Sequence, residues 1–307
     1  MLVHPTGKFD NRAREYGHIE ARPLAAAMGA EIRGVDLAAI TDAQFAEVRD
    51  ALFRHKMIYF RDQTISHADQ EAFSLRFGPF AEDAYTKGVP GHVNVQPVIK
   101  EADSRTGMVF GSGWHTDSPF LANPPAISIL YGVDIPPYGG DTIWASSVLA
   151  YAMLSETMQR MLAPLKVHMS MLWVLQSAQA YGALDDTVVG RLAATRDQAA
   201  LPQDVARKVK GALHPLVRTH PVSGEKSLYF DGSYAVGIDG LTEPESEALL
   251  KFLAAHMTQP AFTCRLRWEP KTLALWDNRI CIHQAFNDYD GFRREMFRTT
   301  VAGEAPR

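Results

Sequence analysis

The sequence is poor in cysteine and has no long apolar run. Only Cys264 and Cys281 are cysteines, too few for a disulfide framework or a cysteine-rich zinc site. We therefore expect two reduced, buried thiols in a cytoplasmic protein. No apolar stretch approaches the ~20 residues that a membrane-spanning helix needs, and the N-terminus lacks the apolar core of a signal peptide. The sequence predicts no membrane partner.

Concentrated positive charge and glycine-rich phosphate loops are also missing. The formal net charge is −4 and the basic residues are scattered, whereas a nucleic-acid-binding surface needs them on one face. No glycine pattern matches a dinucleotide fingerprint or a phosphate loop. The chain is 46% hydrophobic over 307 residues, which is enough to bury a large core. These features favour an enzyme or binding protein for small molecules over a nucleic-acid-binding protein.

The first third of the chain, about residues 1–110, is expected to form a mixed α/β lobe within a single domain of residues 1–307. Thr41 and Ser66 each begin a capping-box pattern, so each should open a helix. Gly78 is expected to end the second helix. Three stretches are predicted as strands: 19–24, 30–37 and 56–60.

The rest of the chain is predicted to be mainly β. Short apolar or alternating stretches separated by turn residues predict strands at 126–133, 142–145, 213–219, 227–230, 262–268, 272–276, 280–283 and 296–301. One helix is expected from Thr242 to about His256. Many short strands with few helices are typical of a sandwich or jelly-roll barrel. Residues 169–210 interrupt the pattern, and an insertion of this length is often a lid or binding loop.

Two residues in the segment GWHTDSPF could bind a metal. His115 and Asp117 are two apart, so on a strand both side chains would face one spot. Together they supply two ligands of the two-histidine, one-carboxylate triad that binds Fe(II) and leaves other positions open for substrate and oxygen. Alone, the pattern fits a polar strand end better than a metal site.

The C-terminal stretch strengthens the metal hypothesis. His283 ends an apolar predicted strand, where an imidazole needs a partner. Arg294 and Arg298 follow and would lie on one side of a strand or on one face of a helix. Arginine is suited to a bidentate grip on a carboxylate. A metal ligand followed by such a clamp is what a chelating 2-oxo acid requires.

In this combination the chain resembles the family of Fe(II)- and 2-oxoglutarate-dependent oxygenases that includes taurine dioxygenase and 2,4-dichlorophenoxyacetate dioxygenase (TauD/TfdA). The resemblance runs over nearly the whole chain, in the order GAEIRGVDL, IYFRDQ, FSLRFGPF, WHTDSPF, PPYGGDTIWAS, HPLVRTHPVSGEKSLYF, LALWDNRICIHQAFNDY and RREMFRTTV. It implies a double-stranded β-helix, a cupin-like jelly roll, with O2 and 2-oxoglutarate as co-substrates. It also implies a homo-oligomer, either a dimer or a tetramer.

The resemblance also assigns roles to single residues. His115, Asp117 and His283 match the iron ligands. Thr142 matches the threonine that hydrogen-bonds the far carboxylate of 2-oxoglutarate, and Arg294 matches the arginine that pairs with it. Arg298 matches a second arginine of the active site, which contacts the substrate anion in sulfonate-binding members.

The substrate is expected to be a small organic anion. Taurine-specific members carry an asparagine where this chain has Gly111, and a histidine after the RFG turn that is missing here. Both changes remove polar contacts to a small sulfonate, so an aryloxyalkanoate-like carboxylate is favoured, with possible cleavage of a C–O or C–S bond. Alkyl sulfates or sulfonates and amino-acid derivatives are the alternatives. The aromatic candidates for the pocket are Trp114, Phe120, Trp173, Tyr181, Phe230 and Tyr234. Core packing explains each of them equally well.

Other classes of protein fit less well. A related halogenase would lack the carboxylate ligand, and Asp117 is present. A zinc hydrolase could use two histidines and one aspartate, but has no use for the clamp of Thr142 and Arg294. A jelly-roll protein that binds a small molecule without catalysis would keep the fold and lose the ligands.

Overall fold

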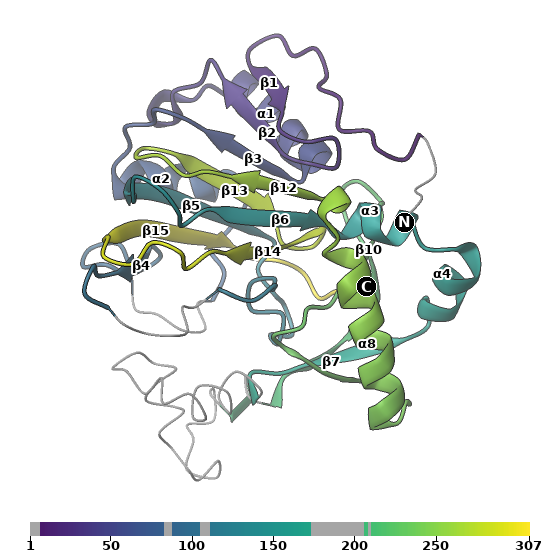
Figure 1. The fold of residues 1–307 in the computed structure, drawn as a ribbon. Helices are drawn as coiled ribbons and strands as arrows, with labels where there is room; N and C mark the ends of the chain where they lie inside the picture. Colours follow the sequence, from purple (N-terminus) through teal and green to yellow (C-terminus); the bar gives the residue numbers. More distant parts are fainter. Residues whose placement is uncertain (1–6, 83–87, 105–110, 173–205, 208–209) are drawn as a thin grey trace.

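The largest sheet contains strands from both ends of the chain (Figure 1). The computed structural model describes residues 7–82, 88–104, 111–172, 206–207 and 210–307. In spatial order the strands of this sheet are β1 (Glu20–Pro23), β2 (Ala30–Arg33), β3 (Met57–Phe60), β13 (Leu273–Asp277), β5 (Ile127–Asp134), β15 (Arg294–Val301) and β4 (Gln96–Lys100). Only the β2–β3 pair within it is parallel. The N-terminal strands therefore extend the main sheet.

A second, three-stranded sheet packs on one face of the large sheet. Its order is β12 (Thr263–Leu266), β6 (Thr142–Ser146) and β14 (Cys281–Ala285). Trp144 of β6 and Trp276 of β13 meet between the sheets, with ring centroids 5.6 Å apart. Leu130 of β5 and Met296 of β15 belong to the same buried cluster. The two facing sheets form the predicted jelly roll.

Two helices cover the opposite face of the large sheet. They are α1 (Asp42–His55) and α2 (His67–Leu75), and both begin with the predicted capping boxes at Thr41 and Ser66. Phe73 of α2 packs edge-on against Phe60 of β3. The prediction that Gly78 ends α2 is wrong, because amide N–H groups after Leu75 already close a tighter turn on the Phe73 and Ser74 carbonyls.

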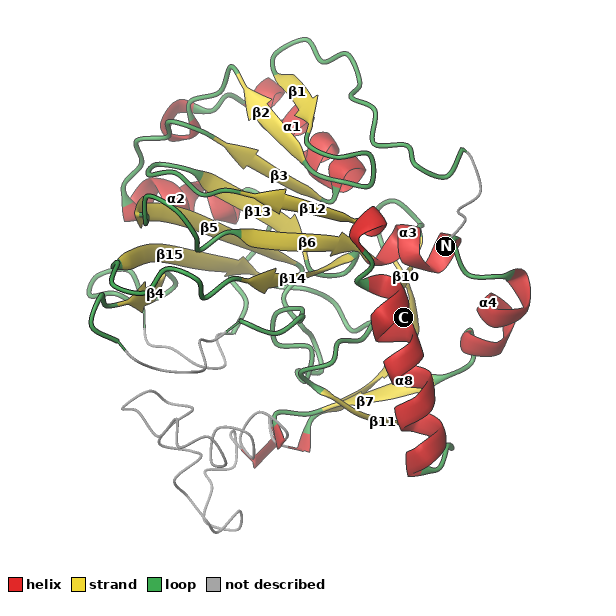
Figure 2. Ribbon diagram, viewed as in Figure 1, coloured by secondary structure: helices red, strands yellow, loops and turns green. Residues whose placement is uncertain are grey.

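The remaining elements lie outside the two facing sheets and the helices α1 and α2 (Figure 2). They comprise the three-stranded sheet β11 (Ala235–Ile238), β7 (Lys166–Met169) and β8 (Ala212–Pro215), the hairpin of β9 (Val217–Thr219) and β10 (Lys226–Leu228), the helices α3 (Ser147–Ala152), α4 (Glu156–Leu162) and α8 (Glu243–Met257), and the short 3-10 helices Leu37–Ala39 and Pro260–Phe262. No helix among the described residues is long and apolar enough to cross a membrane.

Several strand predictions need correction. The stretch 30–37 ends as a strand at Arg33, because Gly34 turns the chain with a φ of 79°. The stretch 213–219 is two strands of different sheets, separated at Leu216. β4, β7 and β11 were not predicted. Most of the predicted insertion at 169–210 lies outside the described residues, and its first residue, Met169, ends β7.

Candidate metal centre

Three buried side chains meet where the two facing sheets lie together. One ligand atom from each of His115, Asp117 and His283 lies within 4.8 Å of the others. Their exposed fractions are 5%, 4% and 7%. The donor set is two imidazole nitrogens and one carboxylate oxygen, the combination typical of a facial metal triad.

A pair of backbone hydrogen bonds brings the two histidines together. His115 N–H donates to the His283 carbonyl at 2.9 Å, and His283 N–H donates to the His115 carbonyl at 2.8 Å. The expectation that His115 lies on a regular strand and that His283 ends one is wrong. His115 forms an isolated bridge, and His283 is the central residue of β14. The bridge replaces a regular strand in aligning the rings, whose centroids are 4.1 Å apart.

Each histidine has a defined environment. His115 Nδ1 lies 2.8 Å from the Gly113 carbonyl, so this nitrogen donates and Nε2 is left to accept or to bind a metal. His283 packs against Trp276, with centroids 4.7 Å apart. Its Nδ1 is buried without a hydrogen-bond partner in the part of the chain that the structure describes. Burial, reinforced by the charge at His115, holds the pKa of His283 well below its usual value.

Asp117 is held as a carboxylate by neighbours from the large sheet. Burial opposes its ionisation, but the Arg298 guanidinium and the two histidines outweigh that effect and lower the pKa of Asp117 to about 2. Arg298 Nη1 lies 3.2 Å from Asp117 Oδ1, and the Ser128 hydroxyl of β5 donates to Oδ2. Asp117 is therefore ionised and oriented, as a metal ligand must be.

A second layer of polar groups supports this carboxylate and was missed in the sequence. Asn278 Nδ2 donates to Ser128 Oγ at 2.8 Å, and the Thr116 hydroxyl donates to the Asn278 carbonyl. Asp231 accepts from the Thr116 backbone N–H at 3.0 Å. The sequence signal for Ser128 is a serine inside an apolar strand. For Asp231 it is only the turn-like run DGS.

The predicted anion clamp lies at one end of the sandwich. Arg294 begins β15 and is 5% exposed. By hydrogen-bond geometry its Nε and Nη2 atoms have no acceptor among the described residues. Trp268 lies between the two predicted clamp residues, because its Nε1 donates to Thr142 Oγ1 at 2.9 Å and its ring is 5.9 Å from the Arg294 guanidinium carbon. Burial lowers the pKa of Arg294, as expected for a guanidinium without a counter-anion.

The other predicted pocket residues are only partly placed. Gly111 lies over the first histidine, since a Cβ added there would be 3.2 Å from His115 Cε1. Phe120 is 1% exposed and packs against Tyr234 with centroids 5.3 Å apart. Trp114 is partly buried and packs against the hydrophobic cluster that contains Phe120 and Tyr234. Trp173 and Tyr181 lie outside the described residues.

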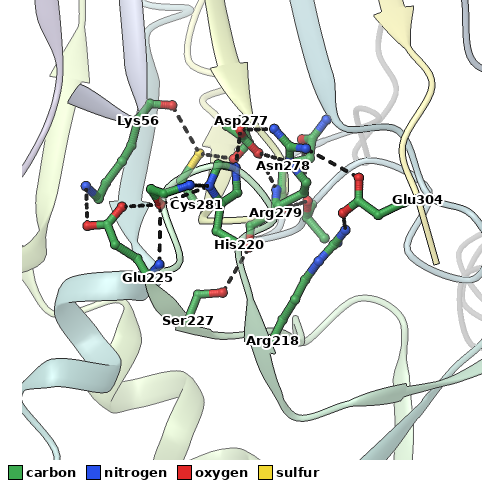
Figure 3. Close-up of polar contacts among 12 residues, drawn as sticks. Lys56, Arg218, His220, Glu225, Ser227, Asp277, Asn278, Arg279, Cys281 and Glu304 are labelled. Carbon is green, nitrogen blue, oxygen red and sulfur yellow. Dashed lines mark hydrogen bonds and ion pairs between the residues drawn. The ribbon is translucent and has the colours of Figure 1, made fainter. Parts of the chain in front are cut away.

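A buried network of charges lies beside the turn that carries Asn278 (Figure 3). Asp277 binds Arg279 Nη2 at 2.6 Å and His220 Nε2 at 3.0 Å. Burial raises the pKa of Asp277, but Arg279 and His220 outweigh it and leave the pKa well below the usual range. Glu304 joins Arg218 to Arg279. We assign this network to the support of the β13–β14 turn.

The residues present fit ferrous iron and 2-oxoglutarate. The bare Nδ1 of His283 and the ionised Asp117 satisfy the chemistry of a metal site. The buried Arg294, whose Nε and Nη2 have no acceptor among the described residues, satisfies that of a carboxylate site. A buried guanidinium without an acceptor is costly unless an anion joins it. These residues are therefore candidates for holding the metal and the far carboxylate.

Comparison with known proteins gives the same result. The model of the family described as "Taurine catabolism dioxygenase TauD, TfdA family" matches residues 20–300. The chain is 36% identical to an alpha-ketoglutarate-dependent sulfate ester dioxygenase of Pseudomonas putida, covering 94% of this chain and 91% of that protein. It is 32% identical to an alkylsulfatase of Acinetobacter baylyi, covering 93% and 86%.

A solved structure is also similar. A taurine dioxygenase from Burkholderia xenovorans superposes with a TM-score of 0.76 at 36% identity, covering 94% of this chain and 91% of that one. The residues that the family model matches include the three residues of the buried triad and, apart from Val301 at the end of β15, the strands of the jelly roll. The protein is thus a member of the TauD/TfdA family and an Fe(II)- and 2-oxoglutarate-dependent dioxygenase.

Proposed function

We propose that the enzyme hydroxylates a small organic sulfate ester at the carbon that bears the ester oxygen. The observation that carries the reaction class is the buried cluster of His115, Asp117 and His283. Two similar relatives with names that specify sulfate esters or alkyl sulfates support the substrate class. Hydroxylation of R–CH2–O–SO3⁻ gives a hemiacetal sulfate, which collapses to the aldehyde RCHO and sulfate. One O2 and one 2-oxoglutarate are consumed, and succinate and CO2 are released.

Different residues of the chain have different proposed roles in this reaction. Iron bound with 2-oxoglutarate supplies the activation of O2. We propose His115, Asp117 and His283 as its ligands, and Arg294 with Thr142 as the grip on the far carboxylate, which fixes the orientation of the oxo acid. The apolar side chains around Trp276 and Trp144 keep water away from the bound oxo acid.

Arg298 is proposed to attract the anionic head of the substrate. Its Nε donates to Gln96 at 2.9 Å and its Nη1 to Asp117, and its side chain keeps 12% of its exposure. A positive charge beside the metal ligand favours an anion in this part of the site. Trp114 and Phe120 are proposed to line the space for the organic part, together with Gly111.

An aryloxyalkanoate is the second candidate substrate. Gly111 favours it, because this position offers no side chain for a polar contact to a small sulfonate. The same hydroxylation next to an ether oxygen would release a phenol. The two candidates differ in the atom that carries the negative charge and in the leaving group.

The test is anaerobic loading with Fe(II), followed by O2 and 2-oxoglutarate in the presence of alkyl sulfates, taurine or aryloxyacetates. Succinate should form fastest with alkyl sulfates, in a one-to-one ratio with released sulfate. Faster turnover with aryloxyacetates and release of phenol would move the assignment to the second candidate. No Fe(II) binding by the folded protein would refute the reaction class.

We further propose that the enzyme acts in the cytoplasm as a dimer or tetramer. The free, buried cysteines Cys264 and Cys281 are compatible with a reducing compartment. Light scattering on the purified protein would determine the number of subunits.

A further inference from the structure

Asp231 is a buried carboxylate outside the ligand set. It lies in the loop between β10 and β11 and is 1% exposed. In the described part of the chain it forms no ion pair, although burial of an unpaired carboxylate is costly. Hydrogen bonds from backbone N–H groups compensate this cost, so the groups that donate them show what the residue does.

The two oxygens of Asp231 bind different parts of the chain. Oδ1 accepts from the backbone N–H groups of Ser233 and Tyr234, both at 2.9 Å. These bonds shape its own loop, as aspartate often does in turns. Oδ2 reaches a distant segment and accepts from the Thr116 N–H at 3.0 Å. The local turn alone therefore does not explain both oxygens.

The bond to Thr116 fixes the peptide unit that joins His115 to Thr116. The carbonyl end of this unit accepts from the His283 N–H at 2.8 Å, and its N–H end donates to Asp231. The unit is thus held from opposite ends, once by the third metal ligand and once by Asp231. Rotation of this peptide would turn His115 and Asp117 away from each other, since it lies on the short backbone path between their side chains.

We propose that Asp231 is a positioning residue, which holds the His115–Thr116 peptide so that the two ligands of this segment face one metal ion. The inference rests on the proposed metal site. It also connects that site to the loop of Tyr234, which packs on Phe120. Groups that orient metal ligands typically change metal affinity by about 10–100-fold when they are replaced.

The test uses two substitutions with different chemistry. In Asp231→Asn a single oxygen can serve either Thr116 or the local turn, and the amide NH2 faces the remaining N–H donors. In Asp231→Ser the hydroxyl can still accept within the turn but is too short to reach Thr116. We expect each variant to bind Fe(II) about tenfold or more weakly than wild type, measured anaerobically by calorimetry without 2-oxoglutarate. At saturating Fe(II), kcat should fall while KM for 2-oxoglutarate stays within about threefold.

Two controls separate positioning from general destabilisation. Ser233→Ala removes the bond from the Ser233 hydroxyl to the Trp114 carbonyl and keeps the Asp231 contacts, so its Fe(II) affinity should match wild type. Val48→Ala removes buried volume from α1, far from the site, and should lower thermal stability without changing Fe(II) affinity.

The possible outcomes are distinct. If wild type binds Fe(II) and both Asp231 variants bind it within twofold of wild type, the positioning role is refuted and the metal site stands. If Val48→Ala loses as much Fe(II) affinity as the Asp231 variants at equal thermal stability, the effect is general and the role is also refuted. If wild type itself binds no Fe(II), the proposed function fails first.

Discussion

Arg294 is a buried residue whose environment lowers the stability of the ligand-free protein. Its guanidinium is buried, and two of its nitrogens lack acceptors in the described chain. The pKa of Arg294 is lowered by that burial. A charge in this situation destabilises the protein until an anion binds. A catalytic function accounts for such a residue better than a structural one.

Replacement of Arg294 by Gln should therefore weaken 2-oxoglutarate binding and leave the ligand-free protein at least as stable as wild type. Hydrogen bonds to a charged group contribute about 1.5–3 kcal/mol, so KM for 2-oxoglutarate should rise roughly 10–150-fold. The matched control is Arg293→Gln, because Arg293 is next in sequence but pairs with Glu101 and Glu295 at the surface. A rise in KM that is equal in both variants would contradict the assignment.

Gly111 is a second residue that we expect to affect metal binding, because it has no side chain and lies against His115. Its φ is 84°, and an added Cβ would lie 3.2 Å from His115 Cε1. We expect Gly111→Ala to displace His115 and to weaken Fe(II) binding about tenfold. Gly91 has a φ of 83° with nothing near its Cβ position. Gly91→Ala should thus show the same backbone cost, about 1 kcal/mol, with unchanged Fe(II) affinity. Equal affinities for the two alanine variants would show that the contact with His115 is harmless.

At the scale of elements, the end of α1 contains a buried histidine that must stay neutral. The Asn11 amide is oriented by its bonds to the Ala25 and Gly29 carbonyls, so its oxygen faces His55 and accepts from Nδ1 at 2.6 Å. His55 Nε2 then carries no proton and has no partner in the described chain. Burial, followed by the charges of the neighbouring Arg54 and Lys56, lowers the pKa of His55 to about 4.

The free energy of unfolding should therefore decrease as the pH is lowered through a defined window. A histidine with a depressed folded-state pKa stabilises the fold fully above the unfolded value near 6.5, and that contribution disappears as the pH falls toward about 4. Between about pH 7 and pH 5 the loss from His55 should be about 2 kcal/mol. Asp231 has a pKa raised to about 6 by burial and acts in the opposite direction.

The difference between wild type and His55→Gln isolates the histidine, because Gln can still donate to Asn11 but does not titrate. Urea unfolding at the two pH values should show a smaller loss in this variant by about 2 kcal/mol. The control Val48→Ala removes buried volume from the same helix without changing a titrating group, and it should keep the slope of wild type. A wild-type slope in His55→Gln would mean that His55 does not titrate in this window.

The same comparison of elements shows what the sequence could predict. The capping boxes at Thr41 and Ser66 are local patterns, and both helices begin where predicted. The triad was predicted from a short motif and a family resemblance. The support of the triad was not, because Ser128 and Asp231 approach it from other strands and loops. The split of 213–219 into β9 and β8 was missed for the same reason, since the sheet that a strand joins depends on distant partners.

At the scale of the whole molecule, the C-terminal segment packs against the hairpin of β9 and β10. The Arg307 carbonyl accepts from the Thr219 N–H at 2.8 Å. Glu304 binds Arg218 of β9 and Arg279 of the β13–β14 turn (Figure 3). Arg218 is 1% exposed, lies over the Tyr229 ring at 4.7 Å, and has no acceptor for Nε and Nη1 among the described residues. Glu304 is therefore the carboxylate that compensates this buried cation.

We expect Glu304→Gln to destabilise the protein by about 2 kcal/mol, because it leaves the buried Arg218 uncompensated. The estimate is at the low side for a buried pair because the Glu304 side chain is 38% exposed and partly screened by solvent. The double variant Arg218→Met/Glu304→Gln removes the cation as well, and its free energy of unfolding should return to within about 1 kcal/mol of wild type. Denaturant unfolding of wild type, both single variants and the double variant completes the cycle. Additive losses in the double variant would show that the two side chains act independently.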